Sequence, residues 1–201
     1  MQTHSRLFSG VRESEAIGLT WDCIDFERGT IRIYHQLLQR PKSEGGYTLA
    51  PLKNDRERLL TPPPTLLALL KERKHEQMQQ RMKAGPAWHG WNSVEEQKTW
   101  FVFTTEFGDH YCPQTVYAHF KKIARQIGAE KANVHSLRHT YAVLCLQNGD
   151  DVKTVQSNLG HATAAFTLDV YGHVSEKMKQ DSAERMEAYM RSTVYGKTQN
   201  G

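Results

Sequence analysis

Residues 135–173 read HSLRHTYAVLCLQNGDDVKTVQSNLGHATAAFTLDVYGH, and they give the strongest indication of the fold in the sequence. Glycines divide it into short segments, and glycine is typical directly after the end of a helix. These glycines are Gly149, Gly160 and Gly172. The segments predicted to be helical are 135–148, 151–158, 163–170 and 175–193. The C-terminal part of the chain is therefore predicted to be almost wholly helical.

The N-terminal half mixes strands with helices. A short helix is predicted over 12–19, and later segments show the alternation typical of strands. These strand segments are 22–26, 30–34, 47–52 and 57–61, followed by a helix from Thr65, a loop over 83–98, a short strand over 100–103 and a helix over 113–127. The prediction is an α+β fold that is mostly helical, with a small three-stranded antiparallel sheet on one edge.

Composition suits one globular domain with a nucleic-acid partner allowed but not required. The 201 residues carry a formal net charge of +4, and 38% of them are hydrophobic. The three cysteines form no CxxC pair, which argues against a disulfide framework and a thiolate zinc site. No apolar run approaches the roughly 20 residues that span a bilayer, and no leader opens the chain. We therefore expect a cytoplasmic protein with no membrane partner.

Several cationic residues stand where they could bind an anion. His135 and Arg138 are three residues apart, so they share one face of the predicted helix. A guanidinium offers a rigid fork of donors to phosphate oxygens. His161 follows Leu159-Gly160, close to the start of the next predicted helix, where anions are favoured. Each motif taken alone also fits an ordinary surface or capping residue.

Two N-terminal motifs and one tyrosine are further candidates for the same anion-binding site. Arg12 shares a helix face with Glu15, which could hold the guanidinium in place or form a plain surface ion pair. Lys53 is predicted at a hairpin tip, where lysines are usually just solvated. Tyr171 comes ten residues after His161 and reads, by itself, as a core tyrosine. Ionising a tyrosine at pH 7 costs about 4 kcal/mol, so a nucleophilic role for it needs nearby cations.

In this order the motifs resemble the catalytic domain of tyrosine recombinases, in particular phage and conjugative-transposon integrases. The resemblance runs from about Leu7 to Tyr189, and its most specific parts are HSLRHT at 135–140 and LGH followed by Tyr171. Cys23 stands where an acid is common in that family. The resemblance implies a catalytic domain over 1–194, a disordered tail over 195–201, and absence of the family's N-terminal core-binding domain.

The resemblance also implies a site-specific recombinase acting on double-stranded DNA. Tyr171 would attack a phosphodiester to form a 3′-phosphotyrosyl link, and a 5′-hydroxyl would later reverse the step without ATP. The arginines would clamp the phosphate oxygens and neutralise charge in the transition state. The implied roles are Arg12 and Arg138 as the clamp, Lys53 as general acid, His135 as base or hydrogen-bond partner, and His161 as the group that orients the phosphate. No metal ion or other cofactor is expected.

Several alternatives stay open. His135 and His139 have the spacing of zinc ligands, but the motif lacks the glutamate of HExxH. A fragment could bind DNA without recombining it, or could relax DNA as type IB topoisomerases do. Phosphate contacts are expected from the hairpin region, namely from Arg40, Lys42, Lys53, Arg56 and Arg58. The helix after Tyr171 either packs on its own domain or docks on a second protomer.

Overall fold

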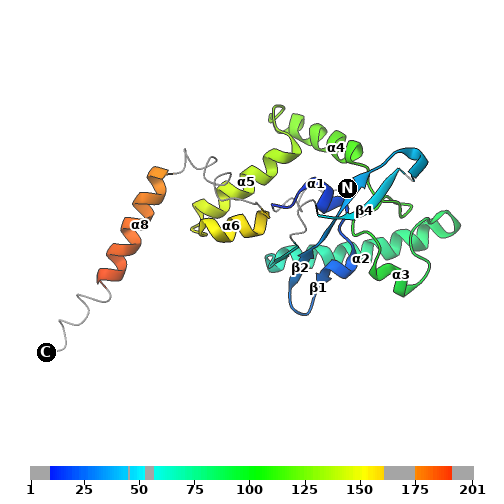
Figure 1. Ribbon diagram of the computed structural model, residues 1–201, viewed down its shortest axis with the longest axis horizontal. Helices are drawn as coiled ribbons and strands as arrows, with labels where there is room; N and C mark the ends of the chain where they lie inside the picture. The colour runs from blue at the N-terminus through cyan, green and yellow to red at the C-terminus, as the bar shows by residue number, and fades with distance from the viewer. Residues whose placement is uncertain (1–9, 45, 53–56, 161–174, 192–201) are drawn as a thin grey trace.

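The computed structural model describes residues 10–44, 46–52, 57–160 and 175–191. The elements in chain order are α1 (Glu13–Ile17), η2 (Trp21–Cys23), β1 (Ile24–Asp25), β2 (Thr30–Ile33), β3 (His35–Gln39), η3 (Lys42–Glu44), β4 (Tyr47–Pro51), β5 (Arg58–Leu60), α2 (Pro64–Ala84), η4 (Gly85–Ala87), α3 (Val94–Lys98), α4 (Pro113–Gln126), α5 (Val134–Gln147), α6 (Val152–Leu159) and α8 (Ser175–Met190). Figure 1 shows α8 lying apart from the other described elements. No described helix is both long and apolar enough to cross a membrane.

The strands form two separate antiparallel units. One sheet has the order β1-β2-β5, with Ile31 of β2 opposite Ile24 on one side and Leu60 on the other. The second unit is the β3–β4 hairpin, in which Leu37 lies opposite Leu49. The prediction of a mostly helical α+β fold with a three-stranded antiparallel sheet is confirmed. The β3 strand was not predicted, because HQLLQ does not alternate as a half-buried strand does.

Other local predictions need correction. Trp21–Cys23 is a 3₁₀ turn, so the first strand shrinks to Ile24–Asp25. The expected strand at 100–103 forms only an isolated bridge, between Thr20 and Phe101. Within the expected loop over 83–98, Val94–Lys98 is helical because the Ser93 side chain caps the backbone N–H of Glu96. The predicted helix over 163–170 lies outside the described residues.

Two apolar clusters hold the described body together. The larger one packs the sheet against α2, and it includes Trp21, Ile31, Ile33, Leu66 and Leu70. The smaller one lies between α5 and α6, where Ala142, Leu146, Val155 and Leu159 are buried and Tyr141 packs against them. The smaller cluster fixes α6 on α5, and this places the C-terminal end of α6 beside Arg138.

Candidate active site

The C-terminal end of α6 receives three arginine side chains. Gly160 ends the helix in the left-handed conformation, with φ 65° and ψ 42°. The last carbonyls of a helix have no partner within the helix and carry partial negative charge. Three successive carbonyls therefore suit guanidinium groups. The pairs are Arg58 Nε with Asn158 O at 2.8 Å, Arg138 Nη2 with Leu159 O, and Arg12 Nη2 with Gly160 O at 3.3 Å.

Glu15 joins two of these arginines from the opposite side. Its carboxylate accepts hydrogen bonds from the Arg12 backbone N–H at 2.8 Å and from Arg12 Nη1 at 2.9 Å. It also accepts from Arg58 Nη1 at 3.1 Å and Nη2 at 2.6 Å. Burial alone would raise the pKa of Glu15, but the hydrogen bonds and charge of Arg58, together with Arg12, lower it overall. The carboxylate is therefore ionised at neutral pH and anchors both guanidinium groups.

Arg138 is buried, and its position depends on the backbone of two distant segments. Its Nη1 donates to the carbonyl of Gly10 and its Nη2 to the carbonyl of Leu159. Burial and the nearby charge of Arg12 lower the pKa of Arg138 to about 10, so it stays cationic at pH 7. Since a guanidinium has five N–H donors, these two bonds leave donors available for an anion.

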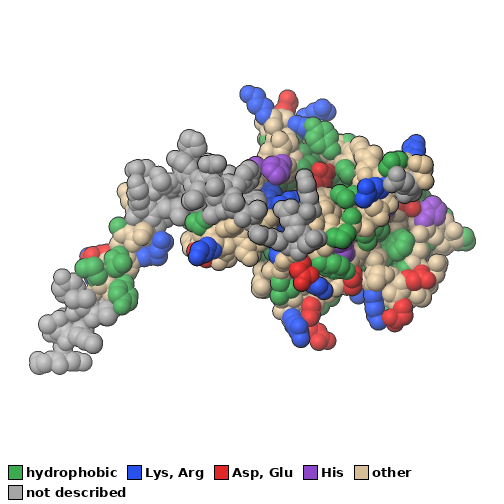
Figure 2. All heavy atoms as spheres, viewed as in Figure 1, with side chains coloured by type: hydrophobic (Ala, Val, Ile, Leu, Met, Phe, Trp, Pro, Cys, Tyr) green, Lys and Arg blue, Asp and Glu red, His purple; other side chains and the backbone are tan. Residues whose placement is uncertain are grey.

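His135 lies one helical turn before Arg138 and is close enough to Arg138 and Arg12 for their charges to act on its ring. Its side chain is exposed, and its ring meets the His139 ring edge-on at a centroid distance of 4.7 Å. Partial burial lowers the pKa of His135, and the charges of His139, Arg138 and Arg12 lower it further. Figure 2 shows histidine side chains beside basic ones on the face where α5 meets the N-terminal part of the chain. The ring is thus neutral at pH 7 and can accept a proton or a hydrogen bond.

The cluster has more positive than negative charge. Arg12, Arg58 and Arg138 carry one positive charge each, and Glu15 is the acidic side chain bonded to two of them. Arg12 is the outermost member, because 43% of its side chain is exposed. A surplus of two positive charges with an exposed guanidinium at its rim suits a phosphate group.

The structure brings together Arg12, Glu15, His135 and Arg138 among the predicted site residues. Arg40 and Lys42 are exposed at the connection between β3 and β4, as phosphate contacts need to be. Lys53, Arg56, His161 and Tyr171 lie outside the described residues. The strands that flank Lys53 belong to different sheets, since β4 pairs with β3 and β5 pairs with β2. The expectation of a β4–β5 hairpin around Lys53 is therefore wrong.

Arg58 also requires a correction. It was predicted to meet DNA phosphates, but its side chain is only 6% exposed and both of its terminal nitrogens donate to the Glu15 carboxylate, which offsets its charge. Arg138 is also buried, but it donates only to backbone carbonyls, so its charge is not paired with a carboxylate in the same way. The carbonyls of Gly10 and of residues 158–160 were missed as parts of the site. A pattern of side chains does not indicate where a backbone carbonyl points, although Gly160 did signal a helix end.

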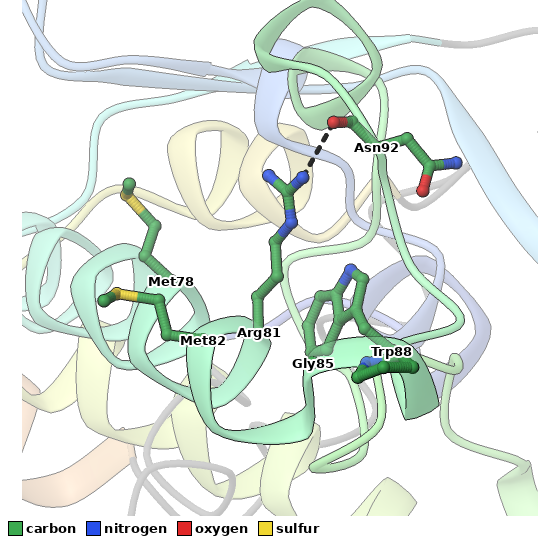
Figure 3. A pocket seen from close by; sticks show the side chains of 7 residues that line it. Met78, Arg81, Met82, Gly85, Trp88 and Asn92 are labelled. Carbon is green, nitrogen blue, oxygen red and sulfur yellow. Dashed lines mark hydrogen bonds between the residues drawn. The ribbon is translucent and has the colours of Figure 1, made fainter.

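A surface pocket lies away from this cluster, and the described residues contain no candidate metal centre. Among the described residues, no group of three or more histidine, cysteine or acidic side chains could hold a metal ion. A surface pocket of about 460 Å³ lies at the C-terminal end of α2, where Arg81 donates to the carbonyl of Asn92 at 2.7 Å (Figure 3). Its lining residues are Met78, Arg81, Met82, Gly85, Pro86, Trp88 and Asn92. None of them belongs to the arginine cluster.

Comparison with known proteins decides the family. The model of the phage integrase family matches residues 6–178, which is most of the chain. The chain belongs to the phage integrase family. It is 31% identical over 195 residues to a tyrosine recombinase XerC-like protein of Caldanaerobacter subterraneus subsp. tengcongensis, covering 89% of this chain and 46% of the relative. It is 30% identical to a tyrosine recombinase XerC of Chlamydia caviae, covering 88% of this chain and 47% of that relative.

A solved structure supports the same fold. The Tn1549 transposon integrase in complex with transposon right end DNA superposes with a TM-score of 0.68 at 20% identity, covering 89% of this chain and 56% of that chain. The predicted resemblance to tyrosine recombinases is confirmed, and so is the fold class. As a member of the phage integrase family, this chain spans about half the length of the curated relatives it matches.

Proposed function

We propose that this chain is the catalytic domain of a site-specific DNA recombinase that cuts and rejoins strands through a 3′-phosphotyrosyl intermediate. The observation that supports this most is the arrangement of Arg12 and Arg138. Both donate to adjacent carbonyls at the end of α6, and Arg12 is also held by Glu15. Two guanidinium groups fixed side by side in this way can bind the two non-bridging oxygens of one phosphate.

In the proposed reaction the protein supplies charge and positioning. Arg12 and Arg138 neutralise the negative charge that builds on the phosphorus oxygens in the transition state. Arginines with this task in other phosphoryl-transfer enzymes contribute about 10³–10⁵ in rate. Because fixed guanidinium groups already provide this charge, the proposal includes no metal ion and no cofactor.

The remaining roles belong to residues matched by the family pattern. The Tyr171 oxygen attacks phosphorus, the bond to the 5′-oxygen breaks, and Lys53 protonates that leaving oxygen. His135 accepts the tyrosine proton or holds it in a hydrogen bond, which fits its neutral ring. His161 orients the phosphate. Attack by a 5′-hydroxyl on the phosphotyrosine then reforms a phosphodiester and frees Tyr171.

The proposal extends to DNA contacts and assembly. Arg40, Lys42 and Arg56 bind backbone phosphates, and such contacts position a protein without reading sequence. The catalytic unit comprises residues 1–194, it works in the cytoplasm, and copies of it associate on DNA through the C-terminal segment. Exposed apolar side chains on α8 support the last point, since Met186 is 59% exposed and Tyr189 is 63% exposed.

Covalent capture from a random DNA pool tests the reaction and finds the DNA site in one experiment. The full chain is incubated, in EDTA, with a pool of short duplexes that have a randomised core and staggered nicks. A nick near the cleaved bond lets the 5′-hydroxyl fragment diffuse away and traps the protein on DNA. We expect a covalent adduct whose DNA sequences converge and whose modified peptide contains Tyr171.

Matched variants give the controls. Tyr171→Phe should abolish the adduct, whereas Tyr189→Phe, which alters an exposed tyrosine of α8, should retain it. An adduct that persists in Tyr171→Phe, or one that needs a divalent metal, would contradict the mechanism. DNA binding without any adduct at high protein concentration would instead support a protein that binds DNA without cutting it.

A further inference from the structure

Arg58 is a buried arginine that contacts two separate parts of the arginine cluster. It is the first residue of β5 and lies opposite Ile33 of the central strand β2. Its Nη1 and Nη2 each donate to one oxygen of Glu15, at 3.1 and 2.6 Å. Its Nε donates to the carbonyl of Asn158, at 2.8 Å. One planar group therefore links the sheet, the helix α1 and the end of α6.

Close packing against Gly160 adds a second link. A Cβ atom on Gly160 would lie 2.9 Å from Arg58 Nη1 and 3.2 Å from its Cδ. A side chain at this position would therefore push the guanidinium away from its present contacts with Glu15 and Asn158. The carbonyl of the same Gly160 accepts a hydrogen bond from Arg12. Arg58 thus lies against both groups that hold the Arg12 side chain, namely Glu15 and Gly160.

Arg12 and Arg58 differ in a way that separates their tasks. Arg12 is exposed over 43% of its side chain, so its guanidinium can reach a phosphate. Arg58 is exposed over only 6%, and both of its terminal nitrogens are taken by Glu15. If Arg12 were the only cationic partner of Glu15, the carboxylate could rotate between the two donors of Arg12, its backbone N–H and its Nη1. With Arg58 bidentate on the other side, the Glu15 plane is fixed, and so is the direction from which Arg12 is held.

We infer that Arg58 is a positioning residue, which orients Arg12 for phosphate by fixing Glu15 and the end of α6. This inference rests on the proposed function, because it assumes that Arg12 binds the reacting phosphate. Arg58 itself touches neither DNA nor the reacting atoms. Lysine cannot replace it, since one ammonium group cannot donate to both Glu15 oxygens and to Asn158 in a fixed plane.

The test compares Arg58→Lys with Arg32→Lys in the full chain. Arg32 is a suitable control because it is an arginine of the neighbouring strand β2 and is paired with Glu57, but more than half of its side chain is exposed. Arginine side chains are labelled with ¹⁵N, and the Arg12 signal is assigned by its loss in Arg12→Lys. NMR then reports rotation about the Arg12 Nε–Cζ bond and the affinity for inorganic phosphate at constant ionic strength.

We expect Arg58→Lys to accelerate Arg12 rotation and to weaken phosphate binding, each by about tenfold, as loss of a charge-assisted hydrogen bond predicts. Arg32→Lys should change neither. On DNA recovered by covalent capture, Arg58→Lys should lower kcat about tenfold or more while KM stays near the wild-type value. A folded Arg58→Lys protein with wild-type Arg12 rotation and wild-type kcat would overturn the inference.

Failure of the inference and failure of the proposed function give different results. If wild-type protein forms no adduct but Arg12 loses its order in Arg58→Lys, the positioning role holds and the recombinase proposal fails. If Arg58→Lys does not fold, the wild-type protein still decides the question. Its Arg58 guanidinium must then rotate more slowly than that of Arg12, and faster rotation of Arg58 would rule out the positioning role.

Discussion

Gly10 supplies the carbonyl that receives Arg138, and it does so from a conformation that favours glycine. Its φ is +80°, and a Cβ atom there would lie 2.6 Å from the Tyr141 ring. Gly10→Ala should therefore cost about 1 kcal/mol for the backbone and about 1–3 kcal/mol more for overpacking. We expect a lower unfolding temperature and a large loss of adduct formation, because the backbone shift displaces the carbonyl that holds Arg138.

Gly128→Ala separates these two costs. Gly128 has φ +72°, but a Cβ atom there would meet nothing within 4 Å. Only the backbone term of about 1 kcal/mol should appear, with wild-type adduct formation. Thermal unfolding and covalent capture measure both variants. Equal destabilisation of the two variants would show that the contact of Gly10 with Tyr141 is not tight.

His135 should titrate below its ordinary range. Its pKa is lowered by partial burial first and by the charges of His139, Arg138 and Arg12 after that. The folded state therefore takes up this proton less readily than the unfolded state. The resulting stabilisation is present above the unfolded pKa of about 6.5 and is lost as pH falls through the folded pKa. An NMR titration should give a midpoint below 6.5 for His135.

The same titration tests which charges act on the ring. Arg12→Met should move the His135 midpoint upward, because one of the neighbouring positive charges is removed. Arg125→Met, on the exposed surface of α4, should leave it unchanged. A midpoint above 6.5 in the wild-type protein would mean that a negative group, rather than the arginines, dominates around His135.

Helical spacing correctly predicted the neighbours of Arg12 and Arg138, whereas the charged hairpin region led to a wrong prediction for Arg58. His135 and Arg138 share a helix face, and Arg12 and Glu15 form an i,i+3 pair that the structure confirms. Arg58 stands in a charged stretch, NDRER, in which charged side chains normally face solvent. Its burial depends on Glu15, 43 positions earlier in the chain. A partner that distant leaves no local pattern in the sequence.

Among the elements, α6 holds the arginines in place, because the carbonyls at its C-terminal end accept their hydrogen bonds. Asp151 caps its start by accepting from the backbone N–H groups of Lys153 at 2.9 Å and Thr154 at 3.0 Å. Asp151→Ala should lower the unfolding temperature and let the opposite end of α6 shift. Because Asn158, Leu159 and Gly160 carry the arginines, we expect adduct formation to fall as well.

Ser93→Ala is the matched control for this helix cap. Ser93 caps α3, which is not among the elements that hold the arginine cluster, by accepting from Glu96 N at 3.2 Å. Its loss should lower the unfolding temperature and leave adduct formation unchanged. If Asp151→Ala and Ser93→Ala reduce adduct formation equally, global stability and not the position of α6 controls the reaction.

The elements were predictable to different degrees for physical reasons. α4 begins at Pro113 and α6 ends at Gly160, and both residues are typical of those positions. β3 was missed because its pairing with β4, and not its own pattern, makes it a strand. The 100–103 segment has strand composition, but its hydrogen bonds amount to one isolated bridge. Strands defined by distant partners are less visible in sequence than helices with local caps.

At the scale of the whole molecule, the net charge of +4 is modest for a protein that is proposed to bind DNA. Glu15 offsets one of the three arginine charges at the site, and the carbonyls at the end of α6 hold the arginines in place. The positive charge proposed to bind phosphate is therefore concentrated at the arginine cluster, which composition alone does not reveal.

The exposed apolar residues of α8 are a second feature of the whole molecule, since α8 lies apart from the other described elements (Figure 1).

From the exposed apolar residues of α8 we predict how copies of the chain assemble on DNA. Met186, Tyr189 and Met190 are 59%, 63% and 39% exposed, so changing them should leave the fold of one copy intact. The triple variant Met186→Gln, Tyr189→Ser, Met190→Gln should keep the wild-type unfolding temperature and DNA affinity for a single site. It should lose the larger complexes that wild-type protein forms on a DNA with two captured sites.

Sedimentation on that DNA measures the effect, and Glu187→Gln serves as the control on the same helix. Glu187 pairs with Arg191 at 2.8 Å on the exposed surface, where such a pair contributes little. The control should therefore assemble like the wild type. If the triple variant also does so, association does not depend on the apolar side chains of α8. A lower unfolding temperature in the triple variant would instead show that α8 packs on its own domain in solution.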